Sequence, residues 1–153
     1  MPPMDVEVRV VLTPSQNPKW HLESPLLQDN KLTFKNNGHP GFNVLFKIED
    51  PESSGYQFPN DKDMALAATP LIGPGTDCPD QGVSWNQFKP KEVINDGVRN
   101  TTLRVHNPNA PGKECDFGYT LFMTLQPDGP GPYWPLDPIG SNQNGPVSRS
   151  LDA

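Results

Sequence analysis

The most regular feature of the chain is a set of short segments in which apolar and polar residues alternate. Val6, Val8 and Val10 alternate with charged residues, which predicts a strand with one buried face over residues 6–12. Residues 119–125 are more continuously apolar, which is typical of a strand in the middle of a sheet. Shorter strands are expected at residues 20–22, 32–35, 43–48, 83–88, 92–94, 101–106 and 147–151.

Glycine and proline separate these segments. The chain contains 20 prolines and 13 glycines in 153 residues, and these residues leave few stretches long enough for a helix. Only residues 61–68 are expected to be helical, with Asp61 or Asp63 as the N-cap and Pro70 beyond the end. Long loops are expected at residues 70–80, 107–114 and 127–146.

The spacing of the strands predicts one all-β domain over residues 1–153. We expect a Greek-key β-sandwich of seven to nine strands, immunoglobulin-like or cupredoxin-like. The strands at residues 32–35 and 43–48 are expected to be neighbours, joined by a loop that contains His39-Pro40-Gly41. The aromatic residues expected in the core are Trp20, Phe34, Phe46, Trp85 and Tyr119.

Residues 31–46 read Lys-Leu-Thr-Phe-Lys-Asn-Asn-Gly-His-Pro-Gly-Phe-Asn-Val-Leu-Phe. This segment resembles the cupredoxins, plastocyanin especially, in which a strand ending in Asn-Asn is followed by a short loop and His-Asn-Val-x-Phe. The resemblance implies a sandwich fold but no blue copper site. Phe42 stands where the family has its first histidine ligand, and no histidine follows Cys115.

A second resemblance lies near the C-terminus. Residues 136–145 read Leu-Asp-Pro-Ile-Gly-Ser-Asn-Gln-Asn-Gly. This segment is similar to the closing segment of a small uncharacterised bacterial family known as DP-EP. The resemblance implies a compact β domain from a bacterium and no particular activity.

Two groups of residues could bind a metal ion, and a metalloprotein is therefore the alternative hypothesis. The first group offers nitrogen and sulfur ligands for a transition metal, and the second offers oxygen ligands for a cation such as Ca²⁺. Both groups also have a simpler interpretation, as an exposed loop histidine and as turn-forming residues. No cofactor is expected. The groups are His39, His106 and Cys115, and Asp137, Asn142 and Asn144.

Nothing in the sequence points to catalysis. The chain has no Gly-x-Ser-x-Gly motif, and paired carboxylates such as Asp61 and Asp63 lie in polar segments. Cys78 and Cys115 are the only cysteines, and the sequence leaves open whether they form a disulfide. We therefore expect a protein that is not an enzyme.

Aromatic residues in a rigid segment are the main candidates for function. Tyr133 and Trp134 lie within Gly-Pro-Gly-Pro-Tyr-Trp-Pro, a stretch of polyproline character. Rigid aromatic residues are favoured at binding surfaces because they lose little entropy on binding. With Tyr56 and Phe58, they are expected to contact a protein or carbohydrate partner. In the alternative, the loop folds back and buries Trp134.

Charge and composition exclude several partners. A net charge of −6 without a basic cluster argues against nucleic acid, and no apolar run is long enough to span a membrane. The first residues lack the features of a signal peptide, so a cytoplasmic location is expected and the sequon Asn100-Thr101-Thr102 means little. We expect a non-catalytic binding module, with self-association through a sheet edge or through the Tyr133-Trp134 loop as a further option.

Overall fold

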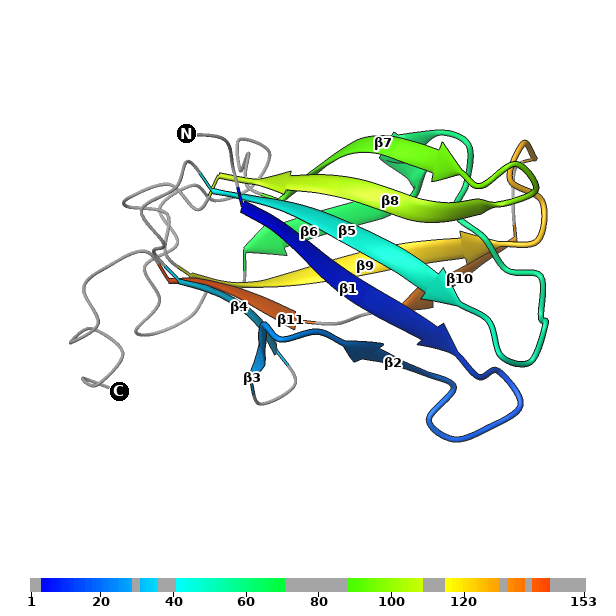
Figure 1. Cartoon of the computed structure of the whole chain (residues 1–153), viewed down its shortest axis with the longest axis horizontal. Coiled ribbons are helices and arrows are strands. Elements are labelled where there is room, and N and C mark those ends of the chain that lie inside the picture. The colour runs from blue at the N-terminus through cyan, green and yellow to red at the C-terminus, as the bar shows by residue number, and fades with distance from the viewer. Residues whose placement is uncertain are drawn as a thin grey trace.

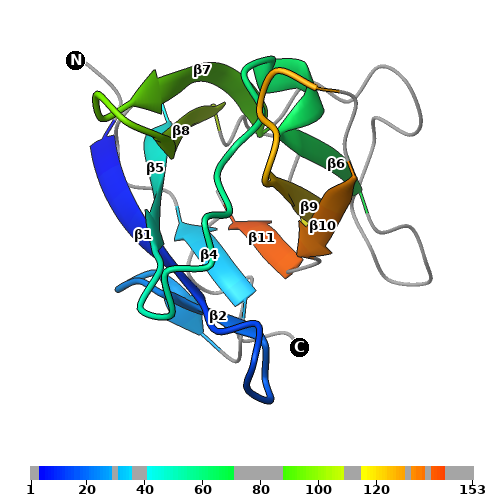
Figure 2. The ribbon, with the colours of Figure 1, turned by 90° about the vertical axis from the view of Figure 1, so that its right-hand side faces the viewer.

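The structure is a computed structural model, and the protein it shows is all-β (Figure 1). Eleven strands in the described residues form two mixed sheets that pack face to face, which confirms the predicted sandwich (Figure 2). The strands outnumber the expected seven to nine because several are too short for a clear alternation. The structure describes residues 4–28, 31–35, 41–70, 88–108, 115–129, 132–136 and 139–143.

The sheet nearest the viewer in Figure 1, here called the front sheet, has the strand order β2-β1-β5-β8-β7. β1 and β5 are parallel, and the other neighbours are antiparallel. Every second side chain of β1 is buried from Val6 to Val10, as the alternation predicts. The bounds are Met4–Leu12 for β1, Trp20–Glu23 for β2, Phe42–Glu49 for β5, Lys89–Asn95 for β7 and Asn100–Asn107 for β8.

The second sheet, here called the rear sheet, has the order β10-β9-β11-β4-β3, with β6 also paired to β9. β9 has partners on both sides, which confirms the predicted central strand. β10 and β11 follow one another along one side of β9, and β6 pairs with the other side. The bounds are Leu27–Gln28 for β3, Lys31–Lys35 for β4, Leu66–Pro70 for β6, Cys115–Thr124 for β9, Tyr133–Leu136 for β10 and Ile139–Gln143 for β11.

The prediction of a helix over residues 61–68 is wrong. Only the single 3-10 turn η1 (Lys62–Met64) forms there, and Asp61 caps it by accepting a hydrogen bond from the Asp63 N–H at 2.9 Å. β6 follows directly, with Leu66 opposite Leu121 of β9. A helix of two turns is marginal by itself, so pairing with a long central strand outweighs the local tendency.

Two other expectations about local structure are also corrected. The segment 127–146, expected to be one long loop, contains β10 and β11. The strands expected at residues 32–35 and 43–48 exist as β4 and β5, but they belong to different sheets. Alternation marks a strand without specifying its partner. The strand expected at residues 147–151 lies outside the described residues. Residues 83–87 of the strand expected at 83–88 also lie outside them.

The core between the sheets is built around a cluster of aromatic rings. The Phe88 ring lies 4.9 Å from Tyr119 and 6.0 Å from Phe46, and the Phe34 ring lies 5.1 Å from Phe42, between ring centroids. Each such pair contributes about 0.5–1.5 kcal/mol beyond the area it buries. The core positions of Phe34, Phe46 and Tyr119 were thus predicted correctly, whereas Trp20 is only half-buried and Trp85 lies outside the described residues.

Within the described parts of the chain, no helix has the length and apolar character needed to cross a membrane.

Candidate binding surface

β10 directs its aromatic side chains toward opposite faces of the rear sheet. Trp134 lies opposite Met123, which is fully buried, so Trp134 is on the core side of the sheet. Tyr133 lies one residue earlier, opposite Thr124, and is therefore on the outer side. The two residues predicted as one binding surface thus have different surroundings.

Trp134 closes one end of the sandwich together with Tyr56. Figure 2 looks onto this end, where the segment after β5 passes from the front sheet to the rear sheet. Tyr56 belongs to this segment, and its ring centroid lies 4.9 Å from that of Trp134. Both side chains are half-buried and pack against the core. This contact ties the crossing segment to the rear sheet.

The outer side of β9 and β10 carries a second pair of rings. The Tyr133 and Phe122 centroids lie 6.1 Å apart with the rings edge to face, and Pro135 lies opposite Phe122 and is exposed. We call Phe122, Tyr133 and Pro135 the outer patch. Phe122 was not among the predicted site residues, although its alternation with the buried residues of β9 places it on this face.

Phe58 does not belong to an exposed surface, and this part of the prediction is wrong. Its side chain is fully buried in the core. Its N–H donates a hydrogen bond to the carbonyl of Asn100 at 3.1 Å, and its carbonyl accepts one from the Asn100 side chain at 2.8 Å. These bonds fix the crossing segment against β8 and direct the Phe58 ring inward.

Asn100, the first residue of the sequon, has a structural role. Its side chain is buried, and its amide nitrogen donates to the Phe58 carbonyl and to Asn60 Oδ1, both at 2.8 Å. Its Oδ1 accepts a hydrogen bond from Asn95 at 3.0 Å. The amide nitrogen that a glycan would need is therefore engaged within the protein.

Asp50 holds the start of the same crossing segment. Burial alone would raise its pKa, but the carboxylate accepts hydrogen bonds from the Gly55 N–H and from the Ser54 hydroxyl and N–H, and pairs with Arg99 at 3.0 Å. Together these bonds lower the pKa of Asp50 to about 2. The Asp50 side chain is 2% exposed, so its surroundings indicate an anchor of the fold rather than an acid or base.

The structure pairs the backbones of two predicted metal ligands, but the two belong to different predicted groups. His106 lies on β8 of the front sheet, whereas Cys115 begins β9 of the rear sheet, with Asn142 of β11 as its backbone partner. Among the described residues, no group of three or more His, Cys, Asp or Glu side chains could hold a metal ion. His39, Asp137, Asn144 and Cys78 lie outside the described residues, and so do the side chains of Cys115 and Asn142.

Phe42, at the position of the first cupredoxin ligand, is 3% exposed and packs edge-on against Phe34. This position therefore contributes to the core, and a phenyl ring offers no lone pair to a metal.

No protein-family model, curated protein or solved structure matches the chain. The resemblances to cupredoxins and to the DP-EP family thus stay predictions, and the functional argument depends on the geometry described above.

Proposed function

We propose that the protein is a non-catalytic binding module that contacts a protein or carbohydrate partner through the outer patch of Phe122, Tyr133 and Pro135. The observation that carries this proposal is the pair of outward-facing rings on β9 and β10, at a strand that pairs on one side only within the described residues. Tyrosine is enriched at binding surfaces because it combines a large rigid ring with a polar end.

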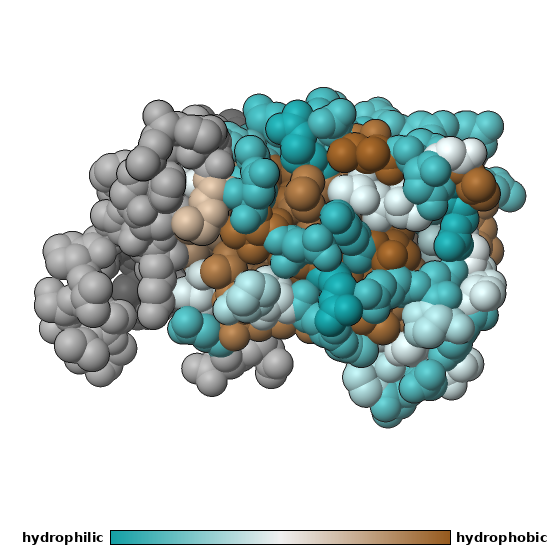
Figure 3. Space-filling view, in the orientation of Figure 1, coloured by the Kyte–Doolittle hydropathy of each residue, from teal (hydrophilic) through white to brown (hydrophobic). Residues whose placement is uncertain are grey.

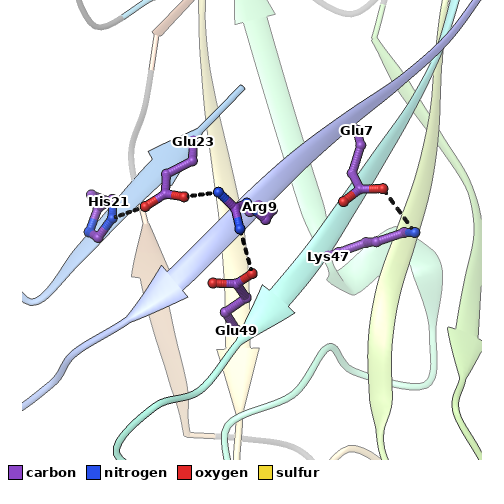
Figure 4. A network of polar contacts seen from close by, with 6 residues as sticks. All are labelled: Glu7, Arg9, His21, Glu23, Lys47 and Glu49. Atoms are coloured by element: carbon purple, nitrogen blue, oxygen red, sulfur yellow. Dashed lines mark hydrogen bonds and ion pairs between the residues drawn. The ribbon is translucent and has the colours of Figure 1, made fainter. Parts of the chain in front are cut away.

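The opposite face of the molecule supports this choice by contrast. On the outer face of the front sheet, Arg9 pairs with both Glu23 and Glu49, and Lys47 pairs with Glu7 (Figure 4). Polar side chains cover much of this face (Figure 3). Charges that are paired with one another and exposed to water are typical of a solvated surface. The described side chains of the outer patch include no charged group.

The scaffold of this proposal is a cupredoxin-like or immunoglobulin-like sandwich without a copper site. The segment over residues 31–46 supports the cupredoxin-like form, and Phe42 in the core supports a scaffold without copper. Elemental analysis of the purified protein tests this part, because stoichiometric copper, zinc or calcium would favour the alternative of a metalloprotein.

Binding by the outer patch is tested by Tyr133→Ala, with Ile94→Ala as the matched control. Ile94 is an exposed apolar residue on the front sheet, 39% exposed, so its replacement removes a similar surface from the other side. Binding is measured on an array of neutral oligosaccharides and by quantitative pull-down from an extract of the source cells. We expect Tyr133→Ala to lower binding at least about tenfold at an unchanged melting temperature, since a central aromatic contact contributes about 2 kcal/mol or more.

Two outcomes contradict the proposal. If Tyr133→Ala binds as the wild type does, the outer patch is not the contact surface. If Tyr133→Ala and Ile94→Ala weaken binding equally, the loss is a general effect of removing surface apolar groups.

Trp134→Ala shows the effect of losing stability, for comparison with the effect of Tyr133→Ala on binding. Loss of the half-buried Trp134 ring is expected to lower the free energy of unfolding by about 2–3 kcal/mol.

A further inference from the structure

The cations on the outer face of the front sheet differ in their partners. Arg9, Lys47 and Arg104 each form an ion pair with a glutamate of a neighbouring strand. Lys89 and Lys91, both on β7, form none within the part of the chain that the structure describes. Among the described residues of this face, lysines without an ion pair thus lie together where β7 begins.

The register of β7 and β8 brings these lysines to one histidine. Lys89 lies directly opposite His106, so the two side chains share a face of the sheet. The register shifts between Pro90 and Glu92, which leaves Lys91 as an extra residue in the strand. Such a bulge redirects side chains, and the positive charge of Lys91 contributes to the lowered pKa of His106 after burial, which is the largest cause. The start of β7 and the end of β8 lie side by side in Figure 1.

The surroundings of His106 disfavour its charged form. The side chain is half-buried, and burial lowers its pKa first, followed by the positive charges of Lys91 and Arg104, whereas a hydrogen bond with the Phe42 backbone acts in the opposite direction. None of the ion pairs among the described residues gives His106 a counter-charge.

The described carboxylates on the strands around this corner are engaged with other residues. Glu92 of β7 accepts a hydrogen bond from Arg104 at 2.8 Å. Asp5 of β1 accepts one from Asn43 at 3.2 Å, and Asn43 is the β5 residue opposite His106. Neither carboxylate pairs with His106 or the two lysines among the described residues.

We propose that His106, Lys89 and Lys91 form a binding site for a small oxyanion such as sulfate or the phosphate group of a phosphomonoester. The three side chains supply an imidazole and two ammonium groups on one face of the sheet, and hydrogen bonds from charged donors to an oxyanion are short and strong. The net charge of −6 makes the site depend on these local groups, because the protein as a whole repels anions.

Edge protection is the competing explanation for the lysines. Lysine, proline and a bulge on an edge strand prevent pairing with another chain, and β7 has all three. That role requires positive charge on the strand but no selectivity between anions. The two explanations therefore differ in whether His106 distinguishes an oxyanion from chloride.

The test is an NMR titration of the His106 imidazole in sodium chloride, sodium sulfate and sodium glycerol phosphate at equal ionic strength. Oxyanion binding stabilises the protonated ring, so the pKa of His106 is expected to be higher in sulfate and in glycerol phosphate than in chloride. Sulfate does not titrate in this pH range. A higher pKa of His106 in sulfate therefore cannot come from protonation of the anion itself. His21, on β2 of the same face, serves as the internal control.

The double variant Lys89→Gln/Lys91→Gln is expected to lose the difference between the anions, whereas Lys47→Gln, on the same face, is expected to keep it. Equal values in all three salts would overturn the proposal and leave edge protection as the role of the lysines. A difference that persists in the double variant would also overturn it. If the double variant does not fold, the loss of oxyanion-dependent Lys91 amide shifts in His106→Gln provides the same test.

Discussion

Asn100 connects three parts of the chain that are distant in sequence, since its side chain bonds to the crossing segment and to β7 while its backbone belongs to β8. Buried polar groups are costly when one partner is removed, because the other partners stay buried without a hydrogen bond. The Asn100 side chain therefore contributes more to the stability of the protein than its size suggests.

Replacing Asn100 by Ala is expected to lower the free energy of unfolding by about 2–3 kcal/mol, because it leaves the Phe58 carbonyl and Asn60 without their donor. Thr102→Ala is the matched control. It also destroys the sequon but keeps Asn100, and it should change stability by less than about 0.5 kcal/mol. Urea denaturation measures both, and similar effects in the two variants would contradict the structural role.

Asp50 should make stability depend on pH in the acid range. Its folded-state pKa of about 2 lies below the value of 3.8 that is usual for aspartate, so its stabilisation is complete above about pH 5 and is lost as the pH falls through about 2. This shift corresponds to about 2 kcal/mol. Between pH 6 and pH 2, the wild type should lose about 2 kcal/mol more than Asp50→Asn in urea denaturation. Equal losses would show that the carboxylate does not contribute.

A comparison of Gly41 with Gly97 separates the energetic cost of backbone strain from the cost of a steric contact. Both have positive φ, 103° and 105°, but a Cβ at Gly41 would lie 2.4 Å from the Asn107 carbonyl oxygen, whereas nothing lies within 4 Å at Gly97. Gly97→Ala should cost about 1 kcal/mol from the backbone alone. Gly41→Ala should cost at least about 2 kcal/mol more, because the contact is with backbone. Thermal unfolding of the pair measures the difference, and equal costs would contradict it.

At the scale of elements, the sequence predicted the strands whose two faces meet different surroundings. β1, β5 and β8 have a buried face and a solvated face, so their residues alternate and the strands were found. β10 was missed because its four residues include a proline and are aromatic on both faces. The pairing of β4 with β11 could not be predicted, since it depends on a strand distant in sequence.

The candidate site was predicted only in part, again because some of its features depend on contacts between residues distant in sequence. Tyr133 and Trp134 were identified by residue type, but only the register with β9 shows that they lie on opposite faces. Phe58 was assigned to the surface because its segment is polar and has no alternation. Its hydrogen bonds to Asn100, which direct it inward, connect positions far apart in the chain.

Pro135 is expected to protect the open edge of β10. The N–H groups of Phe122 and Thr124 donate to Ala65 and Gln57, on the side of β9 away from β10. Their partners Pro135 and Tyr133 consequently direct their backbone polar groups away from β9, toward the open edge. A proline there removes a donor that another chain could use.

Pro135→Thr restores this donor and should increase self-association, measured by sedimentation velocity as a concentration-dependent rise in the mean sedimentation coefficient. Pro51→Thr, in an exposed turn, is the control and should sediment as the wild type. If both variants remain unchanged, other features of the edge prevent pairing.

At the scale of the whole molecule, the two proposed contact surfaces lie on different sheets. The outer patch belongs to β9 and β10 of the rear sheet, and the oxyanion site belongs to β7 and β8 of the front sheet. Substitutions at one surface should therefore leave the other unchanged, since distant sites contribute independently. Measuring anion-dependent shifts of His106 in Tyr133→Ala tests this independence, and a changed response would show that the surfaces are coupled.

The placement of β11 between β4 and β9 has a consequence for synthesis on the ribosome. All five strands of the front sheet have been translated once Asn107 is reached, but the rear sheet needs a strand that ends at Gln143. Until then β4 lacks its parallel partner, and Leu32 and Phe34 belong to an unfinished sheet. Parallel pairing over a long stretch of chain is slow to form. The unfinished rear sheet is thus exposed to chaperones and proteases until Gln143 has been translated.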